Sequence, residues 1–468
     1  MCTFLQRRCL AVVSVVLFFL FFSIPASAQS HLTLLNLIDS SKANLPLFRQ
    51  KLALIKAAQA RITATRHSFL PTLQGAEQLN IGTDNSLSGA VFGLGLLPSA
   101  SGGINAVNNM DPATGNVAVL SGDYELVNFG LNGARLKAAR ADLAINHADF
   151  NKDLYAVKSK VVLLYLNLLK YEIKLTTDQQ NIDRYSSICK VIRALSGSGL
   201  IAGADSSMAN AELAKARIGY NQTQGIINQY KEQLAFVTGI PSQQIIVDTS
   251  FYGHLHPIPP VMNFPIDSIR NPLLDYYNAR KNIFRTNELL IRKSYLPKIH
   301  LMASAWARGS SIQYNNSYQP LSTGLGYQRY NYLAGLALTY NFLNGIYRKD
   351  RLAENRNELE ASEQELEQER LALQSQTLQA DNDLQISRAN LKQIPVQLSS
   401  AEVVYKQKLA QYKAGLISLI DLTNASFVLY RSQIDYIEAN TDWYLALLNK
   451  AVSTGTLDQF IQSLNLEY

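Results

Sequence analysis

The sequence predicts a mainly α-helical protein with four short strands, arranged as an internal duplication. Three observations support this fold class. Short motifs of the first half recur in the same order in the second half. Two segments keep a helical pattern over about 65 residues or more, several times the length of an ordinary helix. Three segments of about ten residues alternate apolar with small or polar side chains, as strands do, and a fourth, over 72–82, shows the pattern poorly.

Residues 1–28 have the features of a secretory signal peptide. Arg7 and Arg8 form a positive start, an apolar run follows over residues 10–22, and the small residues 26–28 provide a cleavage site. The apolar run is too short to cross a membrane as a helix, and it ends at small residues. We therefore expect an exported protein whose mature chain begins directly after this segment.

The composition argues against several classes of protein. The formal net charge is +7 for 468 residues, and basic side chains alternate with acidic ones along the helical segments, so nucleic-acid binding has little support. No apolar run of about 18 residues follows the signal peptide, so no helix is expected to span a membrane. Cys189 is the single cysteine of the mature chain, which excludes an intramolecular disulfide.

Enzymatic motifs are missing from the sequence. There is no Gly-rich phosphate loop and no nucleophile elbow. The one close pair of histidines, His254 and His256, lies in a Pro-rich segment without further metal ligands nearby. We therefore predict no catalytic residue, no cofactor and no metal site.

Three pairs of motifs indicate the duplication, because they keep their order and nearly their spacing. Each pair has its first member in the first half: 68–71 with 294–297, 128–133 with 341–345, and Gly199-Leu-Ile plus Asp205 with Gly415-Leu-Ile plus Asp421. The predicted organisation is therefore a first repeat over 29–240, a Pro-rich linker over 241–265, a second repeat over 266–455 and a C-terminal tail over 456–468.

Each repeat has the same predicted order: helix, strand, loop, strand, long helix, turn, helix. The helices are expected over 32–67, 131–195 and 204–238, and over 272–295, 345–412 and 419–453. The two long helices would measure roughly 100 Å at 1.5 Å per residue, and the shorter ones would stack end to end beside them. A leucine heptad pattern along 352–412 predicts coiled-coil packing, with a kink or interruption at Pro395.

Strands are predicted over about 69–82, 117–129, 297–310 and 331–342. In the last of these, Tyr332, Leu336 and Leu338 face one way, whereas Gly335 and Ala337 face the other. Outer-membrane strands have this pattern, and so has an ordinary half-buried sheet. Four strands are too few to close a barrel and leave open edges, so the sequence favours an oligomer.

The chain resembles the outer membrane efflux protein family, which is TolC-like. The features that carry the resemblance are the repeated layout, the Phe-Leu-Pro and Tyr-Leu-Pro motifs at the strand starts, and the stretch Tyr412–Ala425. The resemblance implies a homotrimer in the cell outer membrane. A 12-stranded transmembrane β-barrel, with four strands from each chain, would contact lipid, and a long antiparallel coiled-coil α-barrel would form the periplasmic domain.

The resemblance also implies partners and a function. The partners would be a periplasmic adaptor, or membrane fusion protein, and an inner-membrane transporter. The chain would be the exit duct of a tripartite efflux or type I secretion system that passes small molecules or proteins to the exterior. The alternative is a periplasmic coiled-coil structural protein that forms no channel.

The two helix–turn–helix tips are the predicted partner-binding sites, because the family meets its adaptor there. The residues concerned are Gly199, Leu200 and Ile201 at the first tip, and Gly415, Leu416, Ile417 and Ser418 at the second. A glycine at such a position ends a helix by adopting positive φ. The same residues would also make a plain turn with no role in recognition.

The predicted pore constriction contains Asp421, Tyr412, Asn424 and Asp205. The resemblance places Asp421 in the pore, where three copies would form an acidic ring that attracts cations. The alternative is that Asp205 and Asp421 are solvated acids favoured by the helix dipole. The family's second acid is Asn424 here and its arginine is Ile417, so the usual network that closes the tip is incomplete.

Overall fold

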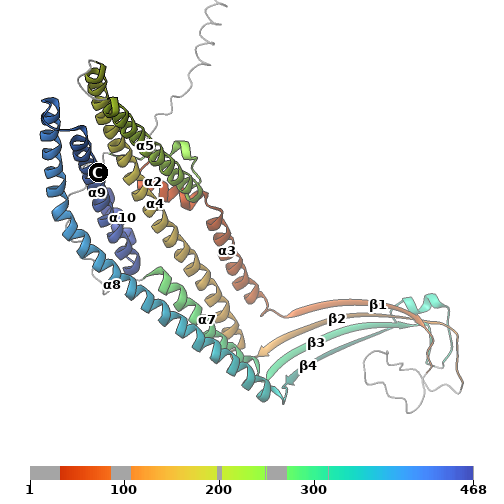
Figure 1. Cartoon of the computed structure of the whole chain (residues 1–468). Coiled ribbons are helices and arrows are strands. Elements are labelled where there is room, and N and C mark those ends of the chain that lie inside the picture. The colour runs from red at the N-terminus through yellow and green to blue at the C-terminus, as the bar shows by residue number, and fades with distance from the viewer. Residues whose placement is uncertain are drawn as a thin grey trace, which may run out of the picture. The chain divides into compact units, whose positions relative to one another are not determined.

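The computed structural model describes residues 32–85, 107–197, 203–247, 249, 271–314 and 316–466. The elements follow one another as shown in Figure 1: α2 (Leu34–Asn44), α3 (Pro46–His67), β1 (Thr72–Gly82), β2 (Ala113–Val127), α4 (Leu131–Gly197), α5 (Gly203–Thr238), η1 (Ser242–Gln244), α7 (Pro272–Ser294), β3 (Lys298–Ser310), η3 (Leu321–Leu325), β4 (Arg329–Thr339), α8 (Asn344–Lys413), α9 (Leu419–Thr454) and α10 (Leu457–Leu466). The signal peptide and most of the Pro-rich linker lie outside the described residues.

The prediction of a mainly helical fold with four strands is confirmed, and both long helices are present. Four details differ. The single helix expected over 32–67 is two helices, because Pro46 starts α3 and its ring cannot continue a helix from residue 45. The strand expected over 117–129 begins four residues earlier, at Ala113, since its first residues pair with β1.

No helix among the described residues is both long and apolar enough to cross a membrane.

The other two differences concern α8 and the C-terminus. The helix α8 continues through Pro395 without the interruption that was one of the two expectations. The tail expected over 456–468 contains α10, which begins after a left-handed Gly455 cap. Phe460 of this helix is fully buried, so the C-terminal segment is part of the core.

The chain forms two compact units, and both halves of the sequence contribute to each. The first comprises Met1–Arg49, Asn151–Pro272 and Arg370–Tyr468, and the second comprises Gln50–Phe150 and Leu273–Glu369.

The second unit contains the sheet. The strands lie in the order β1-β2-β3-β4 and every neighbouring pair is antiparallel, as Figure 1 shows. Leu336 pairs with Leu301, which pairs with Tyr124, so these apolar side chains form one row on one face. Directly beside it, Ala337, His300 and Glu125 form a row on the other face. The predicted division into an apolar and a polar or small face is therefore present in the sheet.

Ion pairs connect neighbouring helices of this second unit. Lys51 on α3 pairs with Asp149 on α4. Arg280 on α7 pairs with Glu365 on α8 at 2.8 Å. Each ion pair joins a shorter helix to a long one that lies beside it, in agreement with the side-by-side arrangement expected from the helix lengths.

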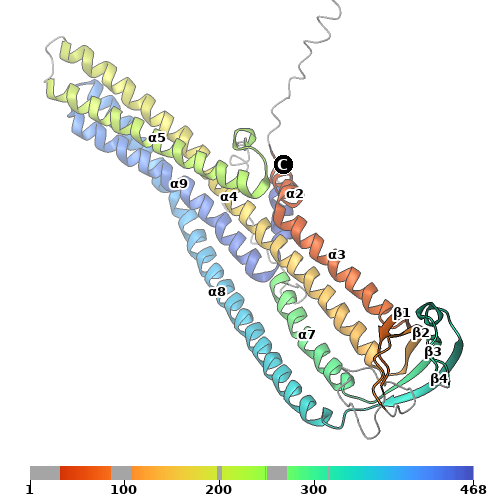
Figure 2. The ribbon, with the colours of Figure 1, turned by 90° about the vertical axis from the view of Figure 1, so that its right-hand side faces the viewer.

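In the described part of the first unit, most buried apolar side chains belong to two separate clusters. The body cluster joins α2, α4, α5, α8, α9 and α10 and includes Leu168, Leu234 and Phe460. The tip cluster lies nearer the turns and includes Ile192, Leu213 and Leu422. Figure 2 shows the hairpin of α4 and α5 running beside that of α8 and α9 over this unit. The two hairpins therefore carry both the core and the predicted tip sites.

Candidate functional site: the helical tips

The turn between α8 and α9 has a defined C-cap. Gly415 has φ of +74°, the left-handed conformation that the sequence predicted for it. The amide of Leu416 donates to the carbonyl of Gln411 at 2.9 Å, and that of Gly415 donates to Tyr412 at 3.0 Å. This pair of bonds is a Schellman motif, which satisfies the last carbonyls of α8. The glycine therefore ends the helix because only a residue without Cβ adopts this conformation at little cost.

A capping box begins α9 directly after this turn. The hydroxyl of Ser418 accepts from the amide of Asp421, and the carboxylate of Asp421 accepts from the amide and the hydroxyl of Ser418 at 3.2 and 2.7 Å. These bonds from Ser418 hold the pKa of Asp421 below its usual value. The side chain is solvent-exposed, so it keeps its charge at the start of α9.

The charge of one predicted pore residue, Asp205, acts on another, Tyr412. Burial raises the pKa of Tyr412, and the nearby charge of Asp205 raises it further. Asp205 lies in the first turn of α5 and Tyr412 in the last turn of α8, so this electrostatic effect acts between the two hairpins near their tips. Asn424 is exposed one turn beyond Asp421, on the same side of α9.

The second tip exposes apolar side chains that a solvated turn would not need. Leu416 is 74% exposed and Ile420 is 55% exposed, whereas Ile417 is half-buried. Exposed apolar side chains at the end of a hairpin are available for contact with another protein. The first tip, with Gly199, Leu200 and Ile201, lies outside the described residues.

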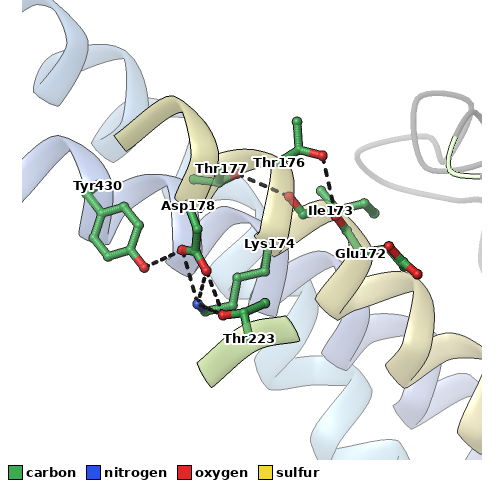
Figure 3. Close-up of polar contacts among 8 residues, drawn as sticks. All are labelled: Glu172, Ile173, Lys174, Thr176, Thr177, Asp178, Thr223 and Tyr430. Carbon is green, nitrogen blue, oxygen red and sulfur yellow. Dashed lines mark hydrogen bonds and ion pairs between the residues drawn. The ribbon is translucent and has the colours of Figure 1, made fainter. Parts of the chain in front are cut away.

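A buried polar layer, which the sequence analysis missed, joins three helices between the two apolar clusters (Figure 3). We define it by Lys174 and Asp178 of α4, Thr223 of α5 and Tyr430 of α9. One carboxylate oxygen of Asp178 accepts from the Tyr430 hydroxyl at 2.6 Å, and the other accepts from the Thr223 hydroxyl at 2.6 Å. The ammonium of Lys174 lies 3.1 and 2.8 Å from these oxygens and 2.7 Å from the Thr223 hydroxyl.

The carboxylate of the layer is buried and its acceptor positions are fully used. The side chain of Asp178 is 2% exposed and Thr223 is 1% exposed. A carboxylate has about four acceptor positions, and two hydroxyls and a bidentate ammonium fill them. Burial and the bond to Asp178 raise the pKa of Tyr430, so its hydroxyl stays protonated and donates. Only the i,i+4 spacing of Lys174 and Asp178 was visible in the sequence, because the other partners come from distant helices.

One turn and a half closer to the tip, Arg184 forms a second link between the hairpins. Its Nη2 donates to Asn181 at 3.2 Å and to Gln433 of α9 at 3.1 Å. Burial lowers the pKa of this arginine. The side chain borders a groove of about 460 Å³ between α4 and α8, which Tyr405 and Tyr412 also line.

Among the residues that the structure describes, no group of three or more metal-binding side chains is present. His254 and His256 lie outside that part of the chain.

The arrangement of two coiled-coil hairpins and a four-stranded sheet with an exposed apolar face has close counterparts among known proteins. The outer membrane efflux protein family matches the chain over residues 37–240 and 269–456. The chain belongs to this family. It is an outer-membrane channel protein of the TolC-like class and not an enzyme.

Among its relatives, protein CyaE of Bordetella pertussis (strain Tohama I) is 24% identical over 424 residues, which cover 89% of this chain and 81% of CyaE. A membrane protein from Pseudomonas aeruginosa has a similar structure, with a TM-score of 0.72, 18% identity and coverage of 92% of this chain and 90% of that one. The outer-membrane channel OprN gives a TM-score of 0.71 at 15% identity, covering 90% of each chain.

Proposed function

We propose that three copies of this chain assemble into the exit duct of a tripartite efflux or type I secretion system. The observation that carries the proposal is the open sheet. Within the described residues, β1 and β4 are its outer strands, and each has one neighbour only. On β4, Leu336 is 69% and Leu338 is 71% exposed. An apolar face of this size with two free edges is unstable in water, so it needs lipid on the face and further strands at the edges.

Closing the edges with copies of the same chain satisfies both needs. Four strands from each of three copies give twelve (3 × 4), enough for a barrel that leaves a central passage. The apolar face would then contact lipid. Gln74, Ser121 and Ser304 pair across the strands and therefore share the opposite face. This polar face would line the passage.

The first unit supports the same assembly. On α8, an apolar stripe faces away from the core, and its members are exposed: Leu371, Leu378, Ile386, Val396, Val403 and Val404. Their spacing includes steps of seven residues, which is the period of a coiled-coil contact. Neighbouring copies would bury this stripe and so complete a helical tunnel in the periplasm.

The second tip would meet a periplasmic adaptor, which connects the duct to an inner-membrane transporter. The exposed Leu416 and Ile420 support this role, because they lie at the end of the hairpins and have no function in the core. The transporter would supply the energy, and this chain would provide the passage for small molecules or proteins.

The assembly is tested by the mass of the protein in detergent, measured by light scattering. A trimer whose folded band in gel electrophoresis disappears on heating is expected. A folded, stable monomer would contradict the barrel. In a second experiment, a photo-reactive amino acid replaces Leu416 in cells, with Lys190, exposed on α4, as the matched control position. Capture of a periplasmic protein from position 416 and not from 190 supports docking at the tip, whereas equal capture contradicts it.

A further inference from the structure

The polar layer of Asp178, Lys174, Thr223 and Tyr430 lies where the apolar core of the first unit is divided. On α4, the body cluster and its neighbours extend to Leu175, and the tip cluster with its neighbours begins at Ile182. On α5, the corresponding residues are Ile227 on the body side and Ala216 on the tip side, with Thr223 between them.

The same division occurs on the other hairpin. On α8, Ile394 packs against the body cluster and Tyr405 against the tip cluster. On α9, Leu422 belongs to the tip cluster and Ala439 to the body cluster, and Tyr430 lies between them. Buried polar side chains gather at this level on three helices, α4, α5 and α9: Thr177, Asp178, Asn181, Thr223, Ser426 and Ser432. On α8 the apolar Ala401 is buried there, and on α9 Leu429 is buried beside Tyr430. Three of the four helices therefore carry buried polar groups between the two apolar clusters.

The two kinds of interface resist movement differently. Apolar contacts are non-directional, so helices can shift against each other within a cluster and keep much of their burial. Hydrogen bonds of 2.6 Å to a buried carboxylate have a narrow geometry, and a buried charge that loses a donor is strongly disfavoured. The register of α9 against α4 and α5 is therefore fixed at the layer more firmly than on either side of it.

Two hydrogen bonds join the hairpins at or near this layer. The bond from Asp178 to Tyr430 and that from Arg184 to Gln433 both join α4 to α9. Nearer the tips, in the described residues 185–197, 203–222 and 400–429, no ion pair joins one hairpin to the other. The hairpins meet there through the tip cluster, which includes Ile188 and Leu419, and through Lys215, whose ammonium lies 6.0 Å from the centre of the Phe427 ring.

We propose that the Asp178 layer is the pivot of the tip: the segments between the layer and the turns move as one unit, while the body cluster stays packed. Asp178 is then a positioning residue, because it acts on the pore end through Tyr430 and α9. One part of the inference, that the moving tip opens and closes a passage, rests on the proposed function. The pivot itself concerns only the packing of the first unit and is testable without transport.

The test uses the assembled full-length protein in nanodiscs. Tyr430→Phe removes the bond between α4 and α9 and leaves Asp178 with Lys174 and Thr223. Tyr230→Phe on α5 is the matched control, because the hydroxyl of Tyr230 forms no hydrogen bond to any described residue, while its ring stacks on Tyr171. Hydrogen exchange is measured in two peptides of α9, one on the tip side (419–429) and one on the body side (437–450).

With Tyr430→Phe, exchange is expected to become about tenfold faster in 419–429, the size of effect that a lost hydrogen bond to a buried charge produces. Exchange in 437–450 should stay unchanged, and the control should alter neither peptide. Thr223→Val is a second variant that should accelerate 203–222 of α5 and spare 227–238. Equal acceleration on both sides of the layer, or none on the tip side, would overturn the pivot.

A conductance measurement in planar bilayers separates this inference from the proposed function. If the wild-type protein forms pores, Tyr430→Phe should raise the fraction of time spent open and Tyr230→Phe should not. An unchanged open fraction together with a loosened tip would contradict the role of the pivot in gating. If the wild-type protein forms no pore, the proposed duct fails, and the exchange experiment still decides whether the layer is a pivot.

Discussion

Arginine substitutions along β4 should be costly on one face of the strand and tolerated on the other, with a gradient along its length. The strand covers Arg329–Thr339, so its middle is Ala334. Leu336 lies two residues further, about 7 Å along the strand, and Leu338 about 13 Å, at ~3.3 Å per residue. With a strand tilt of about 40°, these steps are about 5 and 10 Å along the membrane normal.

The lipid-facing band of such barrels is about 25 Å tall, so Leu338 lies near its edge and Leu336 well inside it. Arginine on this face costs about 2–4 kcal/mol at the middle and about 0–1 kcal/mol near the interface. Ala334→Arg should therefore impair insertion most, Leu336→Arg less, and Leu338→Arg least. Three copies would multiply the cost to about 6–12 kcal/mol per trimer at the middle position. Ala337→Arg is the control, because its row contains His300 and Glu125 on the opposite face.

The assay is the fraction of protein in outer membranes that migrates as the folded, heat-modifiable form, measured at equal expression. A second measurement refolds each variant from urea into lipid vesicles and compares the midpoints. If Ala337→Arg impairs folding as much as Leu336→Arg, the assignment of the two faces is wrong. If the cost does not decrease from Ala334 to Leu338, the strand is not centred in the membrane as its bounds indicate.

Three further predictions concern the helices. Ser418→Ala should remove the capping box and destabilise the start of α9, and the pKa of Asp421 should rise towards its ordinary value. Because the folded pKa of Asp421 is lowered, its contribution to stability is present above the unfolded pKa and is lost as pH falls through the folded pKa. Amide exchange at 419–424 should therefore accelerate in acid in the wild type and depend little on the charge of Asp421 in Ser418→Ala. Equal pH profiles of the two proteins would contradict the argument. In planar bilayers, Asp421→Asn should remove most of the block of channel current by multivalent cations added on the tip side. Asn424→Asp should strengthen this block, and Asp205→Asn should reduce it less than Asp421→Asn does. An unchanged block in Asp421→Asn would mean that Asp421 is only a capping acid. Phe460→Ala should cost about 3–5 kcal/mol, because the side chain is fully buried, and should lower the thermal midpoint of the helical signal; an unchanged midpoint would show that α10 is dispensable for the core.

Several parts of the candidate site were predictable because they depend on neighbours in the chain. Gly415 was expected to end α8 with positive φ, and it does so at +74°. The alternation in 332–338 correctly predicted which residues of β4 share a face. The early helix was predicted less well, since the break at residue 45 depends on Pro46, whose ring is compatible with a helix start and not with its interior.

Other features could not be predicted from local pattern. The tail over 456–468 has no long helical period, yet it folds as α10 because the body cluster offers an apolar surface that buries Phe460. The capping role of Asp421 has a local cause in Ser418, three residues earlier, but the same spacing also fits the predicted pore acid. Its lowered pKa within one chain and the mutual repulsion expected among three copies act in opposite directions.

The sequence by itself determined the long helices, the four strands, the repeated order of motifs and the family resemblance, because these follow from periodicity and from residues near one another in the chain. The tertiary structure alone decided which distant residues meet. Asp178 and Tyr430 are 252 positions apart, and no sequence pattern around either residue predicts the hydrogen bond between them. A buried charge must find its donors wherever the fold brings them, so the polar layer and the division of the core around it exist only in the packed hairpins.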